Sequence, residues 1–172
     1  MKNKTLFILG SSRSDGNTRK VVDYLMDQLP SDLLNLKEFD FSYYDYEFKN
    51  QEDDFFGLAK SLLEYDTLIF CSPVYWYSMS AIMKTFFDRM SDLLKIHKPI
   101  GRALAGKNMF ALCCSSDETK YDGFFMPFEK TAGYLDMTYG GDIHTWMEDG
   151  KIPDEAKEKI DVFIQKIIAT QK

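Results

Sequence analysis

The sequence has no cluster of basic residues and no long hydrophobic run. It contains 21 Lys and Arg against 27 Asp and Glu, which gives a net charge of −6 at pH 7. Nucleic acids and anionic membranes attract basic patches, so we expect neither as a partner. The longest uncharged stretch, residues 67–83, is interrupted by Pro73 and several serines and is a poor membrane span. The apolar part of the N-terminus is too short for a signal peptide, and we expect a cytoplasmic protein.

Cysteine is also scarce, and its spacing excludes several redox and metal sites. The three cysteines are Cys71, Cys113 and Cys114, and no Cys-x-x-Cys pair is present. Zinc ribbons, iron–sulfur sites and redox dithiols are built on such pairs, so we expect no metal site. Cys113 and Cys114 are adjacent and would face opposite sides of a strand, which disfavours a disulfide between them. Reduced thiols are typical of intracellular proteins.

The signature motifs of several other enzyme classes are missing. The sequence has no Walker A motif, no Gly-x-Gly-x-x-Gly fingerprint and no Gly-x-Ser-x-Gly nucleophile elbow. No cysteine is followed six positions later by the arginine of cysteine phosphatases, and the run IFCSP lacks the aspartate that receiver domains phosphorylate. The two histidines, His97 and His144, stand alone, and we assign neither a catalytic role.

What the sequence does contain is an alternation of apolar runs with helical patterns. This alternation is typical of right-handed βαβ units in a single α/β domain, with a parallel sheet covered by helices on both faces. Ligands in such folds bind beyond the carboxyl ends of the strands, where the strand order switches. Residues 40–54 show no period and predict a long loop. The patterns predict strands at 5–9, 33–39, 67–71, 108–114 and 135–143, and helices at 17–29, 55–63, 79–94, 124–134 and from 153 onward.

The loop between the first strand and the first helix, GSSRSDGNT at residues 10–18, has the composition of an anion site. A helix N-terminus offers free backbone N–H groups and a partial positive charge, and Arg13 adds a donor fork. The hydroxyl and amide groups of Ser11, Asn17 and Thr18 add further donors. These residues suit a phosphate, although a solvated turn with Asp15 or Asn17 as the helix cap is the alternative.

A row of three aromatic residues follows the third predicted strand. Tyr75, Trp76 and Tyr77 come directly after Pro73 and Val74, and Ser78 or Ser80 would cap the next helix. Aromatic faces at this edge of the sheet would stack on a planar heterocycle. The alternative is a subunit contact, because Tyr and Trp favour interfaces. A phosphate site on the neighbouring loop favours a ligand that has both parts.

The two segments GSSRSDGNT and SPVYWYSMSAIMKTFFDRM resemble the signature segments of flavodoxin-fold NAD(P)H-dependent FMN reductases. The family pattern is roughly Gly-Ser-x-Arg-x-x-Gly-Asn-Thr followed by Ser-Pro-x-Tyr-x-x-x-x-Ser-x-x-x-Lys-x-x-x-Asp-Arg, and both match in order and spacing. The resemblance extends over nearly the whole chain. It implies a flavodoxin-like three-layer α/β/α sandwich over residues 1–172, with five parallel strands in the order 2-1-3-4-5, and a homodimer.

The resemblance also implies roles for individual residues. The FMN phosphate would be held by Ser11, Arg13, Asn17 and Thr18, and the isoalloxazine ring would be lined by Pro73, Val74, Tyr75 and Trp76. Tyr77 stands where many relatives have glycine, so its ring would narrow the access to the flavin or cover it. Residues 42–54 lack the cysteines with which one branch of the family binds an iron–sulfur cluster.

The loop after the fourth predicted strand completes the expected site. Ser115 and Ser116 would hydrogen-bond the flavin, and Tyr121 would cover one face of it. A helix-capping serine in a solvated loop is the alternative, because relatives often have a glycine-rich loop here.

The expected function is an FMN-dependent oxidoreductase. NADPH or NADH would pass a hydride to bound FMN, and a small acceptor would then take two electrons: a quinone, an azo or nitro compound, or free flavin. The cofactor carries this chemistry, so we name no catalytic side chain. The alternatives are a one-electron carrier of the flavodoxin type and a relative without flavin that serves as an interaction module.

Overall fold

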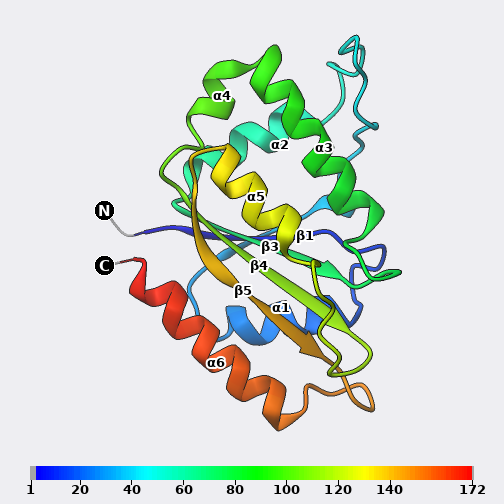
Figure 1. Ribbon diagram of the computed structural model, residues 1–172, viewed down its shortest axis with the longest axis vertical. Coiled ribbons are helices and arrows are strands. Elements are labelled where there is room, and N and C mark those ends of the chain that lie inside the picture. The colour runs from blue at the N-terminus through cyan, green and yellow to red at the C-terminus, as the bar shows by residue number, and fades with distance from the viewer. Residues whose placement is uncertain (1–2, 172) are drawn as a thin grey trace.

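The computed structural model describes residues 3–171 as a parallel sheet between two layers of helices (Figure 1). The five strands lie in the order β2-β1-β3-β4-β5, as predicted. No helix in the described residues is both long enough and apolar enough to cross a membrane. The elements are β1 (Thr5–Leu9), α1 (Asn17–Met26), β2 (Asp32–Asn35), α2 (Phe55–Ser61), β3 (Thr67–Pro73), α3 (Ala81–Lys95), α4 (Lys98–Arg102), β4 (Asn108–Ser115), α5 (Met126–Tyr134), β5 (Thr138–Trp146) and α6 (Asp154–Ala169).

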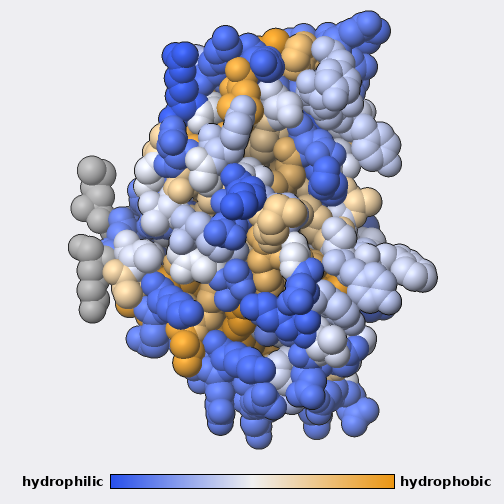
Figure 2. Space-filling model, in the orientation of Figure 1, coloured by the Kyte–Doolittle hydropathy of each residue, from blue (hydrophilic) through white to orange (hydrophobic). Residues whose placement is uncertain are grey.

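The central strands are apolar because helices cover them on both faces. Every residue of β1 and β3 is buried, which is the pattern expected of a parallel sheet. Alternate residues of β1 enter different cores: Leu6 and Ile8 pack with α2, α3 and α5, whereas Phe7 and Leu9 pack with α1 and α6. Figure 1 shows these two groups of helices on opposite sides of the sheet. The outer surface of α6 carries charged side chains (Figure 2).

Apart from small shifts at the ends of other elements, three details differ from the prediction. The second strand ends at Asn35 rather than residue 39, because the Asn35 side chain accepts a hydrogen bond from the Lys37 backbone N–H and begins a short 3-10 helix at Leu36–Glu38. The last strand is shifted to Thr138–Trp146, since a turn with Asp136 at φ 54° separates it from α5. The connection expected around His97 contains the additional short helix α4.

The long loop at residues 40–54 is held to the body of the protein by Arg89 of α3. The Arg89 side chain is fully buried. Its guanidinium donates to the backbone carbonyls of Ser42 (2.9 Å) and Asn50 (2.7 Å) and pairs with the carboxylates of Asp53 and Asp92. The loop has no regular secondary structure, so its path is fixed by these bonds to Arg89 rather than by the backbone hydrogen bonds of a helix or sheet.

Replacing Arg89 with methionine should therefore destabilise the protein strongly. The change leaves the buried Asp92 carboxylate and the partly buried Asp53 carboxylate without their cation, and such losses cost about 3–5 kcal/mol of unfolding free energy. Urea denaturation measures the difference. Lys84→Met on the same helix is the matched control: it removes the exposed pair with Asp88 and should cost about 1 kcal/mol or less. Equal effects of the two variants would contradict the clamp role.

Candidate functional site

The site lies where the loops after β1, β3 and β4 meet at the carboxyl edge of the sheet. The Gly10 N–H donates to the carbonyl of Cys71 (2.9 Å), and the Val74 N–H donates to the carbonyl of Cys114 (3.0 Å). These bonds continue the parallel ladder past the ends of the strands. The three loops therefore leave the sheet side by side, at the switch in strand order between β1 and β3.

Ser80 joins the first two loops. Its buried hydroxyl donates to the Gly10 carbonyl (2.6 Å) and accepts from the Met83 N–H (3.3 Å), so Ser80 is the cap of α3. The Ser80 N–H donates to the Ser72 hydroxyl (2.9 Å). Gly10 has no room for a side chain, because an added Cβ would lie 2.9 Å from Met83 Cβ. The β1 loop is thus pressed against the start of α3.

A cavity of about 200 Å³ opens between the three loops. Most of the predicted site residues line it, and three of them, Trp76, Tyr77 and Tyr121, lie outside the lining. Gly16 and Cys114 also line the cavity and were not in the predicted set. The predicted residues in the lining are Ser11, Arg13, Asn17, Thr18, Pro73, Val74, Tyr75, Ser115 and Ser116.

The N-terminus of α1 faces this cavity without a capping side chain. The N-cap residue is Gly16, and no side chain bonds to the first free N–H groups. The alternative interpretation, in which Asp15 or Asn17 caps the helix, is therefore wrong, and Asp15 is exposed. Uncapped N–H groups, the positive end of the helix dipole and nearby Arg13 form a donor set that suits a phosphate. The residues present thus fit the phosphate end of a nucleotide cofactor.

The aromatic row forms a tight turn beside the cavity. Tyr75 and Ser78 exchange backbone hydrogen bonds of 2.9 and 3.1 Å, and the two residues between them have positive φ, 47° at Trp76 and 66° at Tyr77. Such turns favour glycine and asparagine, so two bulky aromatic residues here are strained. The turn projects from the carboxyl edge of the sheet at the right of Figure 1.

The side chains of this turn differ in their surroundings. The Tyr75 hydroxyl bonds to the Ser12 hydroxyl (2.7 Å) and ties the turn to the β1 loop. Trp76 is 92% exposed. Tyr77 meets Tyr121 of the β4–α5 loop edge to face, with ring centroids 5.2 Å apart. Tyr77 and Tyr121 thus form an aromatic pair next to the cavity.

The β4 end of the cavity contains a contact that the sequence did not predict. The Ser115 hydroxyl lies 2.7 Å from Nε2 of His144, while the Ser116 hydroxyl lies 3.3 Å from an Asp117 carboxylate oxygen. The predicted last strand stopped at residue 143, so His144 was placed in a loop. In the structure it lies within β5, and the register that pairs Cys113 with His144 brings its ring to Ser115.

The thiols near the site are protonated at neutral pH. All three cysteines are free and buried. Burial raises the pKa of Cys114, which lines the cavity, to about 11, and it also raises the pKa values of Cys71 and Cys113. Nucleophilic cysteines have lowered pKa values, so a thiolate mechanism is not supported.

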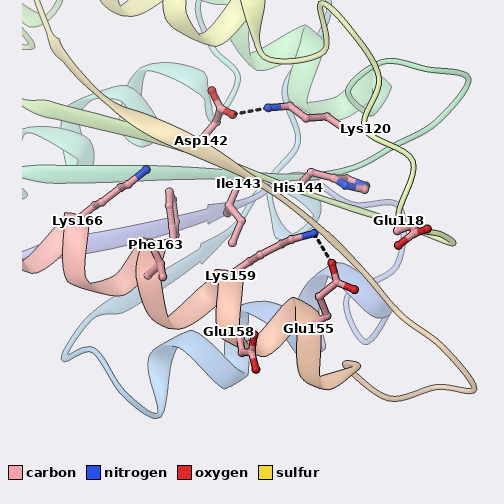
Figure 3. A pocket seen from close by; sticks show the side chains of 11 residues that line it. Glu118, Lys120, Asp142, Ile143, His144, Glu155, Glu158, Lys159, Phe163 and Lys166 are labelled. Atoms are coloured by element: carbon pink, nitrogen blue, oxygen red, sulfur yellow. Dashed lines mark ion pairs between the residues drawn. The ribbon is translucent and has the colours of Figure 1, made fainter.

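A wider cavity of about 630 Å³ lies between β5 and α6 (Figure 3). Its lining mixes both signs of charge, with Lys120 paired to Asp142 (3.7 Å) and Lys159 paired to Glu155 (3.1 Å). Glu155 and Glu158 of α6 add negative charge to this lining, and it contains no row of aromatic residues. Among the described residues, no group of His, Cys, Asp and Glu is placed to hold a metal ion. The narrower cavity therefore remains the candidate cofactor site.

Comparison with known families agrees with this geometry. The family of NADPH-dependent FMN reductases matches residues 3–143. The chain belongs to this family. The putative NAD(P)H-dependent FMN-containing oxidoreductase YwqN of Bacillus subtilis is 24% identical over 148 residues, which are 80% of this chain and 82% of the relative. An NADPH azoreductase of a Bacillus species is 31% identical over 105 residues, or 60% of this chain and 59% of the azoreductase.

An iron–sulfur flavoprotein of Archaeoglobus fulgidus is 29% identical over 176 residues, which cover 95% of this chain and 78% of that protein.

Solved structures show the same fold. The Trp repressor binding protein of Bacillus subtilis has a TM-score of 0.71 at 22% identity, over 94% of this chain and 98% of that one. General stress protein 14 of Treponema denticola, solved in complex with FMN, has a TM-score of 0.61 at 17% identity, over 98% and 97%. The family match confirms the predicted FMN cofactor and oxidoreductase class, and the solved structures confirm the fold.

The strained turn gives a testable prediction on stability. Trp76→Asn should raise the unfolding free energy by about 1 kcal/mol, because asparagine tolerates positive φ and the exposed tryptophan loses little packing. Tyr43→Asn is the matched control, since Tyr43 is also an exposed aromatic residue but does not have positive φ. Its effect should stay within about 0.5 kcal/mol. Chemical denaturation measures both values, and a clear loss of stability in Trp76→Asn would show that the turn is not strained.

Proposed function

We propose that the protein passes a hydride from NADPH or NADH through bound FMN to a small acceptor, which is a quinone, an azo or nitro compound, or free flavin. The observation that carries this proposal is one cavity in which an uncapped helix N-terminus meets an aromatic turn. One end suits a phosphate and the other suits a planar ring. We treat residues 1–172 as one FMN-binding domain.

The phosphate end would use both backbone and side-chain donors. Ser11 and Thr18 are buried at the floor of the β1 loop, and Arg13 and Asn17 are exposed at its rim. The two inner hydroxyls would fix the position of the phosphate, while the Arg13 guanidinium would add charge from the open side. Thr18 also lies within the first turn of α1, where the helix dipole adds to the attraction.

The ring end would be shaped by the turn after β3. Val74 and Tyr75 line the cavity, and Pro73 stiffens the turn behind them. The cavity volume of about 200 Å³ is below the range of about 300–1,000 Å³ usual for ligand pockets. Part of the ring would therefore extend beyond the cavity toward Tyr77 and Tyr121, whose aromatic pair would cover it. Because of Tyr77, only thin and planar acceptors would reach the flavin.

The residues of this site would bind and orient rather than transfer protons. Among the described residues that line the cavity, Arg13 is the only one of the Asp, Glu, Lys, Arg and His types, and burial raises the pKa of the Cys114 thiol to about 11. FMN, when bound, supplies the hydride chemistry at its N5 position. Ser115 and Ser116 would contribute hydrogen bonds at the β4 side.

We also propose a homodimer in the cytoplasm. Trp76 is 92% exposed, and Tyr43 and Tyr46 of the 40–54 loop are 77% and 87% exposed. Exposed aromatic residues of this kind are enriched at protein interfaces. The free, buried cysteines suit a reducing compartment.

The decisive experiment tests whether the protein is a reductase or a one-electron carrier. The purified protein is loaded with FMN, and excess flavin is removed. Addition of NADPH or NADH without oxygen should bleach the flavin spectrum, and a quinone or azo dye should then sustain steady nicotinamide oxidation. A flavin that binds but is not reduced would support the one-electron carrier instead. Protein that retains no flavin at micromolar concentration would support the interaction module.

The phosphate site has a sharper test. Arg13→Met should weaken FMN binding more than tenfold, since a hydrogen bond to a charged group contributes about 1.5–3 kcal/mol. Riboflavin, which lacks the phosphate, should bind the variant and the wild type equally. Arg19→Met is the matched control, because Arg19 pairs with Asp23 on α1 and does not line the cavity. Fluorescence titration gives the affinities, and equal losses for FMN and riboflavin would reject the phosphate role of Arg13.

A further inference from the structure

The Ser115 hydroxyl is engaged on two sides. It donates to the backbone carbonyl of Asp117 (2.6 Å), and it lies 2.7 Å from Nε2 of His144. Ser115 lines the narrow cavity, whereas His144 lines the wide cavity between β5 and α6. The contact between Ser115 and His144 therefore forms the wall that separates the two.

Hydrogen counting fixes the direction of this contact. A serine hydroxyl has one hydrogen and two lone pairs. Because the Asp117 carbonyl can only accept, the Ser115 hydrogen must point to it. His144 must then carry its hydrogen on Nε2 and donate to the Ser115 oxygen. The second lone pair of Ser115 is left for the cavity, so its side chain offers an acceptor and no donor.

The His144 ring is held firmly in this position. Its exposure is 9%, and its ring is stacked on Trp146, with centroids 6.0 Å apart and an angle of 20° between the planes. Trp146 is fixed in turn, since its indole N–H donates to Glu148 (2.9 Å) and Lys159 of α6 lies over its ring. A buried, stacked ring loses little freedom when it donates, so His144 is preorganised.

The charged groups around His144 keep it neutral. Burial lowers the pKa of His144, and the positive charges of Lys159 and Lys120 lower it further, while Asp117 acts in the opposite direction. Figure 3 shows His144 among Lys120, Lys159 and Glu118. A neutral imidazole has a single N–H, which agrees with a fixed tautomer.

We propose that His144 is a positioning residue of the FMN site, which fixes Ser115 as an acceptor for a hydrogen-bond donor on the cofactor. The available donors on oxidised FMN are the ring N3–H and the ribityl hydroxyls. The inference rests on the proposed FMN site, and it gives a function to a histidine outside the two signature segments.

The tautomer can be tested without flavin. The chain has only two histidines, so nitrogen-15 labelling of histidine gives two sets of ring signals, and His144→Gln assigns them by removing one set. Long-range proton–nitrogen NMR of the apoprotein should show His144 protonated on Nε2 and bare on Nδ1. The opposite tautomer would overturn the inference.

The positioning role is tested by FMN affinity in three variants. His144→Phe keeps a ring against Trp146 but removes the donor, and it should weaken FMN binding about fivefold to tenfold. His144→Gln places an amide N–H near the position of Nε2 and should recover most of that loss. Ser115→Ala removes the acceptor, and adding His144→Phe to it should cause no further loss.

The outcomes separate this inference from the proposed function. If the wild-type protein binds no FMN, the proposed cofactor site is rejected, and this role of His144 is rejected with it. Tight binding in the wild type with an unchanged affinity in His144→Phe would overturn the positioning role alone. A loss from His144→Phe that persists in the Ser115→Ala background, or that glutamine does not recover, would show that His144 acts through packing.

Discussion

The site depends on the hydrogen bond between the Ser80 hydroxyl and the Gly10 carbonyl, at 2.6 Å. Gly10 is the first residue after β1, and Ser80 is the N-cap of α3, so this bond holds together two loops that are 70 residues apart in sequence. The absence of a side chain at Gly10 allows Met83 to pack directly against the loop. The phosphate end and the ring end of the cavity are thereby fixed relative to each other.

Around this fixed point, the protein stores strain where we propose that the ligand binds. Trp76 and Tyr77 have a backbone conformation that favours glycine, although both are large. Strain of this kind is retained where function requires the side chains. Here it presents aromatic rings outward, next to a cavity whose inner lining is mostly small and polar. The middle of α3 has a different role, because Arg89 there is buried and fixes the 40–54 loop.

The sequence predicted the parts of the fold in which local pattern and burial agree. The fully apolar runs of β1, β3 and β4 could be read directly, because helices cover both faces of these strands. The shift of β5 could not be read, since Gly140 interrupts its apolar pattern. That glycine is required because a Cβ there would lie 2.2 Å from the Phe110 ring, and Phe110 is far away in sequence.

The candidate site was predictable in its two signature segments and, in part, in the loop after β4, where Ser115 and Ser116 line the cavity. The residues of the β1 and β3 loops are adjacent in sequence and have recognisable chemistry, and the structure places most of them around one cavity. His144 was missed because its role depends on register: β4 and β5 must pair so that residue 144 lies beside Cys113. The uncapped Gly16 was missed because Asp15 and Asn17 are both stronger caps by residue type.

The central claim is that the loops after β1, β3 and β4 together form the FMN site. A crystal structure of the protein with FMN tests it most directly. The account predicts the phosphate against the N-terminal backbone of α1, near Arg13, and the ring between the Tyr75–Ser78 turn and Ser115. FMN in the wide cavity between β5 and α6, or with its phosphate away from α1, would contradict the account.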